Sequence, residues 1–230
     1  MALLCVVGCK VETDVQLNVN SSGDGTVVVV ARLDKAAVQE LGGFEKLKTD
    51  DLEQVGWTID PPVDLEGGGL ELRASKPFEQ AKLQLVMNEV GGVDGVFREW
   101  SVGVADGFAE TTYQVNGAIR LTGSLDQFSD DELKTALDGL SLGRTPAELS
   151  ALVAQPTDVA LRVEVLAPNS APFSETFYPA GGESVDKKVA VVAKNADETS
   201  IRILIFAGVC ILAAGIVTFV GRNRTRRGAR

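Results

Sequence analysis

The chain has 230 residues, a net charge of −10 at pH 7 and no histidine. The lack of histidine excludes Ser-His-Asp and Cys-His catalysis and histidine-ligated zinc, which leaves an enzyme only carboxylate, Lys, Tyr or Ser–Lys chemistry. Five arginines within 222–230, together with Arg202, supply six positive charges, so residues 10–200 carry −16. So acidic a region should be repelled by nucleic acid, whose binding depends on Lys and Arg, although acidic surfaces most often serve solubility.

The first nine residues, MALLCVVGC, end in a pattern that resembles a bacterial lipobox. Val6-Val7-Gly8 precedes Cys9, and in lipoproteins the cysteine at this place is acylated. Cys5 is a poor alternative because bulky Leu4 precedes it. Residues 1–9 lack a basic start and a full apolar run, so we interpret them as a truncated signal that ends at the lipid-attachment residue Cys9. The alternative is that Cys9 simply begins a strand.

Residues 10–194 predict one folded domain. Alternating apolar residues over 11–19 and 26–33, joined by the turn 21–25, predict a β-hairpin. Short helices are expected at 34–41 and 50–53, and a strand at 70–74. A helix should begin at Pro77 and continue to about residue 90, with Phe78, Ala81, Leu85 and Val86 on its buried face.

The second half of the domain continues the mixture of strands and helices. Strands are predicted at 97–104 and 111–122, and capping boxes predict helices at 130–140 and 146–153. A strand at 159–165, a loop over 168–184 and a last strand at 187–192 complete the domain. The expected fold class is α+β: a curved, mostly antiparallel sheet with helices packed on one face, followed by a C-terminal transmembrane helix.

A strongly curved sheet could enclose an apolar interior that accommodates a lipid tail. The aromatic residues Phe97, Trp100, Phe108 and Tyr113 are candidates for lining it, and ordinary core positions are the alternative for them. No catalytic, metal or cofactor site is predicted. A calcium loop at 18–29 is disfavoured because Val29 stands where the bidentate Glu is required.

The C-terminal part has the pattern of a membrane anchor. After a polar linker at 195–202, residues 203–221 carry no charge, and nineteen such residues are enough to cross a bilayer core. The basic tail 222–230 should be cytoplasmic by the positive-inside rule, which makes residues 10–200 extracytoplasmic.

The lipobox at Val6–Cys9, the opening hairpin Val11–Leu33, the α+β domain, the final apolar segment and the arginine-rich tail together resemble the actinobacterial LppM-domain lipoproteins. The resemblance implies a cell-envelope lipoprotein whose exported domain binds a lipid or glycolipid. It supplies no catalytic residues.

Three functions follow from these observations. The leading hypothesis is a non-enzymatic envelope lipoprotein that binds a lipid, lipoglycan or other amphiphile, for which we expect an interior cavity. The alternative is an acidic, extracytoplasmic module that docks another envelope protein, which a filled core and an exposed apolar patch would favour. The third is a hydrolase, which needs two carboxylates converging in a cleft.

Overall fold

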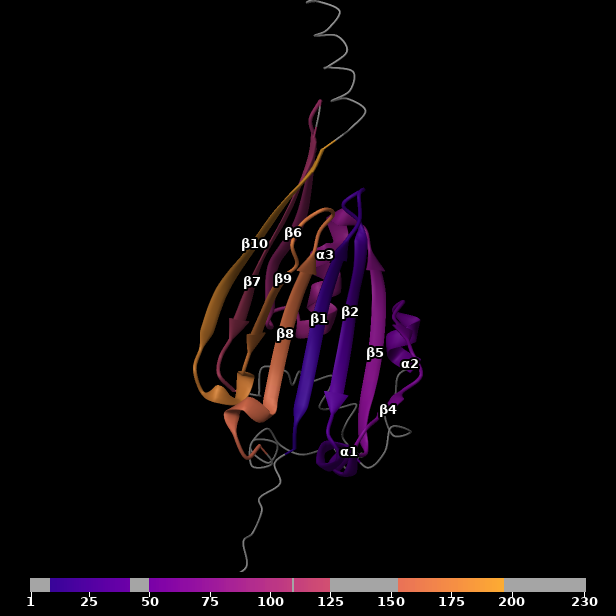
Figure 1. The fold of residues 1–230 in the computed structure, drawn as a ribbon, viewed down its shortest axis with the longest axis vertical. Coiled ribbons are helices and arrows are strands. Elements are labelled where there is room, and N and C mark those ends of the chain that lie inside the picture. Colours follow the sequence, from indigo (N-terminus) through magenta and orange to yellow (C-terminus); the bar gives the residue numbers. More distant parts are fainter. Residues whose placement is uncertain (1–8, 42–49, 109, 125–152, 197–230) are drawn as a thin grey trace, which may run out of the picture.

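The computed structural model describes residues 9–41, 50–108, 110–124 and 153–196, and these form two β-sheets (Figure 1). The large sheet has the strand order β3-β5-β2-β1-β8-β9, with β4 also paired to β5, and the small sheet has the order β10-β7-β6. The strands of the large sheet are β1 (Val11–Val19), β2 (Gly25–Leu33), β3 (Thr58–Ile59), β4 (Val63–Leu65), β5 (Gly69–Phe78), β8 (Val159–Leu166) and β9 (Phe173–Phe177). Those of the small sheet are β6 (Phe97–Asp106), β7 (Glu110–Leu121) and β10 (Val185–Ala196).

Helices are short in the described part of the chain. They are α1 (Lys35–Leu41), α2 (Asp50–Gln54) and α3 (Leu83–Gly91), with 3-10 turns η2 (Gln80–Lys82), η4 (Pro156–Asp158) and η5 (Pro179–Gly181). The short helices predicted at 34–41 and 50–53 are confirmed. The first is capped as expected, because the Ala37 N–H donates to the Asp34 carboxylate at 2.8 Å.

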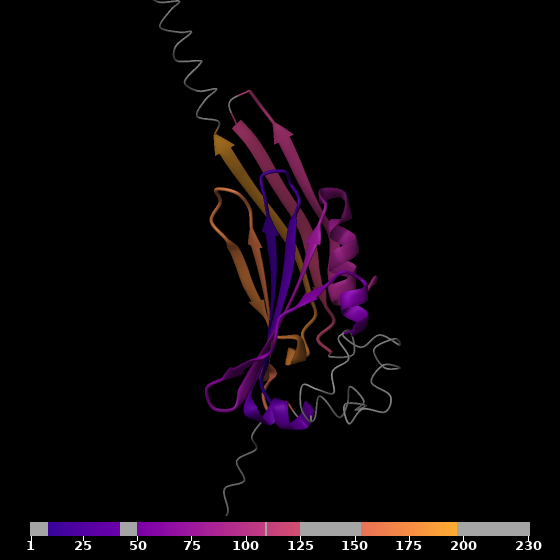
Figure 2. The same ribbon diagram turned by 90° about the vertical axis from the view of Figure 1, so that its right-hand side faces the viewer.

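The expected α+β class is wrong, because the protein is mostly β and has two sheets. The small sheet takes the place where helices were expected, and its buried residues join one core with the inner face of the large sheet. Helix α3 covers only part of that face and lies on the side away from β8 and β9 (Figure 2). The large sheet is also mixed, since β1 pairs antiparallel with β2 and parallel with β8.

The predicted hairpin at 11–33 is confirmed as β1 and β2. Alternate residues of β1 face the core, and Val15 and Leu17 are each 1 % exposed. The turn between the strands contains Gly23 at φ 87°, a conformation that glycine adopts without strain.

The helix predicted from Pro77 begins later than expected. Strand β5 continues through Pro77, which pairs with Thr26 of β2, and α3 begins only at Leu83. Proline is compatible with this place because no other described strand pairs with β5 there. Val86 is buried as predicted, together with Leu83 and Met87, whereas Leu85 was wrongly expected on the buried face and is 59 % exposed.

Two strand predictions near the C-terminal end are also corrected. Strand β9 lies inside the loop expected at 168–184 and pairs with β8. Strand β10 is longer than predicted and extends to Ala196, into the range expected for the linker. An ion pair between Lys187 of β10 and Glu175 of β9, at 3.0 Å, joins the edges of the two sheets.

Among the described residues, no helix is both long and apolar enough to cross a bilayer. The membrane helix expected at 203–221 and the tail at 222–230 lie outside these residues, as do the helices expected at 130–140 and 146–153 and the first eight residues. The appended membrane helix of the expected fold class is therefore not supported.

The core depends on a close approach between Trp100 and Gly117. The Trp100 indole packs directly on Gly117 of β7, where a Cβ would overlap its ring. Trp100 also meets Phe97 edge-on, with ring centroids 6.3 Å apart. Glycine at this position thus makes room for the largest side chain of the small sheet.

We expect Gly117→Ala to lower the free energy of unfolding by about 1–3 kcal/mol, because the added methyl group overpacks a filled core. Urea denaturation followed by circular dichroism measures this loss. Gly103→Ala in β6 is the control, since its Cβ would meet nothing closer than Gln114 at 3.8 Å. Equal stability of the two variants would contradict this account of the packing.

Candidate functional site

An open groove of about 750 Å³ lies where the β1–β2 turn, the end of β5 and helix α3 meet. Volumes of this size are typical of sites for small molecules. The groove is at the end of the large sheet where β1 finishes and β2 begins (Figure 1). Its lining residues are Asn18, Val19, Asn20, Asp24, Gly25, Thr26, Lys76, Pro77, Phe78, Glu79, Lys82, Leu85, Val86 and Glu89.

Helix α3 and the turn before it form one wall. Lys82, Leu85, Val86 and Glu89 follow each other at the three- and four-residue spacing that places side chains on one helical face. Val86 is 5 % exposed, whereas Leu85 remains 59 % exposed beside it. The wall is therefore apolar in its middle and charged at both ends.

The opposite wall is held in place by the β1–β2 turn. Asp24 accepts a hydrogen bond from the Gln80 N–H at 2.9 Å, and the Gln80 side chain donates to the Val102 carbonyl at 2.8 Å. Phe78, which is 4 % exposed, provides an apolar surface between the walls. These contacts join the hairpin, the start of the helical segment and β6 around the groove.

A partly buried lysine closes the groove on the side of α2. The Lys76 ammonium donates to the Val55 carbonyl at 2.6 Å and to the two Glu89 carboxylate oxygens at 2.8 and 2.6 Å. The Trp57 indole N–H also donates to Glu89, at 2.9 Å. The Lys76 side chain is only 15 % exposed, so this network is a fixed part of the site.

Helix α3 is attached to the small sheet through Gln84. Strand β6 shifts its register between Arg98 and Ser101, with Glu99 at φ 57°. At this irregularity the Trp100 backbone N–H donates to the side-chain oxygen Oε1 of Gln84, and Nε2 of the same side chain donates to the Phe97 carbonyl at 3.1 Å. One side chain thus satisfies two backbone groups at the bulge.

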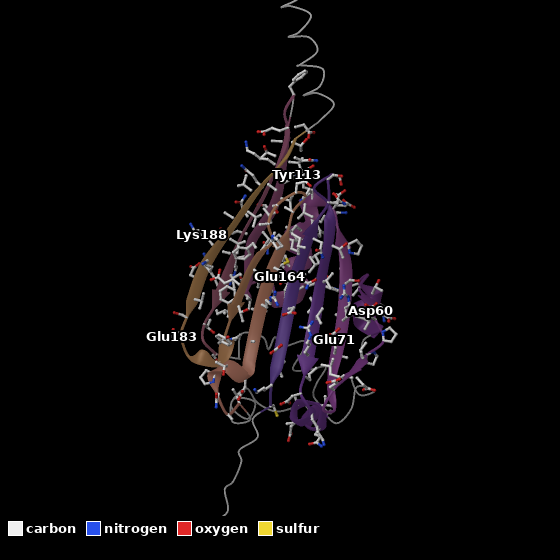
Figure 3. All side chains as sticks on the ribbon, viewed as in Figure 1. Asp60, Glu71, Tyr113, Glu164, Glu183 and Lys188 are labelled. Carbon is white, nitrogen blue, oxygen red and sulfur yellow. The ribbon has the colours of Figure 1, made fainter. Side chains whose placement is uncertain are left out.

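The aromatic residues considered as pocket-lining lie elsewhere. Phe97, Trp100 and Tyr113 are 2–3 % exposed and belong to the shared core. The Tyr113 hydroxyl donates to the Ser21 carbonyl at 3.2 Å and so supports the β1–β2 turn (Figure 3). Phe108 is 69 % exposed after β6, and none of the four lines the groove.

Cys9, the expected lipid-attachment residue, is partly exposed and precedes β1 by two residues. Val6, Val7 and Gly8 lie outside the described residues.

A second charged cluster lies on the large sheet, away from the groove. Arg32 contacts Asp14 at 2.6 Å and Glu71 at 2.8 Å. The hydrogen bond that Arg32 donates to Asp14 raises the pKa of Arg32 above its usual value against the opposing effect of desolvation, and Glu71 adds to the increase. Both carboxylates converge on an arginine that stays charged at every physiological pH, which fits an ion cluster of structural type. Within the described part of the chain, no group of three or more Cys, Asp or Glu residues could hold a metal ion.

Comparison with known proteins gives one structural likeness. No family model and no curated protein matches the sequence. The structure is similar to the NMR structure of the folded domain of the Mycobacterium tuberculosis LppM protein, with a TM-score of 0.43 and 12 % identity, over 84 % of this chain and 94 % of that chain. A similarity of this size assigns neither family nor function.

We expect Arg32→Met to destabilise the fold by about 1–3 kcal/mol, because it leaves the buried Asp14 carboxylate without its partner. This expected loss of stability is smaller than that for breaking a fully buried ion pair, because the Arg32 side chain is 36 % exposed. Adding Asp14→Val should restore at least half of the loss, as measured by urea denaturation of both variants. A double variant less stable than Arg32→Met would refute this account.

Proposed function

We propose that this protein is a non-enzymatic lipoprotein of the cell envelope whose extracytoplasmic domain binds an amphiphile in the groove beside α3. The observation that carries the proposal is the composition of that groove. Its lining combines polar and charged residues with an apolar strip of Val19, Phe78, Leu85 and Val86, of which Leu85 is the most exposed at 59 %. An acyl chain could cover the strip while its head group stays among the polar residues.

The expected interior cavity is replaced in this proposal by a surface site. Phe97, Trp100 and Tyr113 fill the region between the sheets where a cavity was expected. The exposed Leu85 gives an alternative place for apolar contact, since covering such a side chain removes apolar surface from water. The ligand class stays a lipid, glycolipid or other amphiphile.

An acyl group at Cys9 is the proposed attachment to the membrane. Support comes from the sequence Val6-Val7-Gly8-Cys9 and from the partial exposure of Cys9 before the first strand. The similarity to the LppM domain agrees with this picture, but membership in that family stays a prediction.

A protein-interaction module is the second candidate, and a specific observation favours it. The core is filled, and exposed apolar side chains at Leu52, Val55 and Leu85 lie on segments around the network of Lys76. A partner protein could cover such side chains as well as a lipid could. The two candidates differ in whether a small amphiphile alone binds with measurable affinity.

The hydrolase hypothesis has less support. Asp14 and Glu71 contact Arg32, and Glu89 contacts Lys76 and Trp57. These carboxylates are occupied by structural contacts, so we do not nominate an acid–base pair.

We expect Leu85→Gln to weaken binding of a fluorescent fatty-acid probe about tenfold, because it places an amide in the apolar strip. Fluorescence titration of the purified protein measures the dissociation constant. Val192→Gln is the matched control, because Val192 is also 59 % exposed but lies outside the groove, and it should leave affinity unchanged. Equal affinities for both variants and the parent would exclude the groove as the site.

The acylation is tested separately. The chain, with a basic and apolar leader added before residue 1, is expressed in an actinobacterial host supplied with an alkynyl fatty acid. We expect the parent and Cys5→Ala to incorporate the label and Cys9→Ala to lose it. A label that persists in Cys9→Ala would show that Cys9 is not the attachment residue.

A further inference from the structure

The charges that line the groove are unbalanced. Two lysines, Lys76 and Lys82, face three acids, Asp24, Glu79 and Glu89. One negative charge is therefore in excess within the groove. The surrounding domain adds to this imbalance, since residues 10–200 carry −16. The net field opposes an anionic head group and favours one that contains a positive charge.

Lys76 is poorly placed to bind an anionic head group. An ammonium group has three N–H donors, and those of Lys76 are engaged by Val55 and by both oxygens of Glu89. An anionic head group would have to displace one of these short contacts at a side chain that is only 15 % exposed. It would also lie close to the Glu89 carboxylate.

Lys82 is also a weak site for an anionic head group. Its ammonium pairs with Glu79 at 3.0 Å, and the two side chains are 57 % and 70 % exposed. An exposed pair of this kind is strongly screened by water and salt. Glu79 is the more exposed partner of this pair, and an ammonium or quaternary amine could approach it without displacing the contacts between Lys76 and Glu89.

We propose that the groove selects amphiphiles whose head group carries a positive charge, zwitterionic or cationic, over anionic ones of the same chain length. This inference rests on the proposed function, because it names the ligand class of the same groove. The head group lies at Glu79, and the chain covers Leu85 and Phe78. The selection is produced by fixed charges of the groove, so it should respond to a local charge change and not to a distant one.

The test compares lauroyl lysophosphatidylcholine with lauroyl lysophosphatidylglycerol, each below its micellar concentration, by isothermal titration calorimetry on the full chain. We expect the choline lipid to bind at least tenfold more tightly. Glu79→Lys should reduce this preference about tenfold. Glu183→Lys makes the same charge change at the other end of the molecule from Tyr113 (Figure 3) and should leave the preference within about twofold.

The outcomes separate the two proposals. Equal or tighter binding of the glycerol lipid would overturn the head-group selection but leave amphiphile binding intact. A similar shift in both lysine variants would also overturn it, because the preference would then come from total charge and not from the groove. If neither lipid binds, the proposed function itself fails and the selection with it.

Discussion

The contact between Gln84 and the bulge in β6 determines how the groove is built. Strand β6 is an edge of the small sheet, and beside its register shift the Trp100 N–H and the Phe97 carbonyl both bond to the Gln84 side chain. Because Gln84 is on α3, the bulge fixes the rotation of that helix on the small sheet. Leu83 and Met87 then face the core, and Leu85 is directed to the groove.

Local patterns in the sequence were sufficient for some elements and not for others. The hairpin of β1 and β2 could be predicted because its alternation and its glycine-containing turn are adjacent in the chain. The boundary between β5 and α3 could not, because Pro77 is equally compatible with a helix start and an edge strand. Strand β9 was missed because only five residues form it, between prolines that are typical of loops. The division into two sheets depends on pairings between distant segments, such as β1 with β8, which local periodicity does not encode.

The groove could not be predicted from the sequence either, because it too is formed by segments that are distant in the chain. Its residues come from β1 and its turn, from the end of β5 and from α3, and only those on α3 have a periodic spacing. Aromatic content was a misleading indicator, since Phe97, Trp100 and Tyr113 serve the core. The ion pair between Lys76 and Glu89 could be suspected only once β5 and α3 were known to be neighbours.

The length of β1 has a consequence for how a ligand could reach the protein. Cys9 precedes one end of this strand, and Asn18 and Val19 at its other end line the groove. Nine residues of β-strand extend about 30 Å, which equals the thickness of a bilayer's hydrocarbon core. With an acyl chain on Cys9, an upright domain would hold the groove well above the lipid head groups. A bound amphiphile would then have left the leaflet completely, as cargo between membranes or between proteins does.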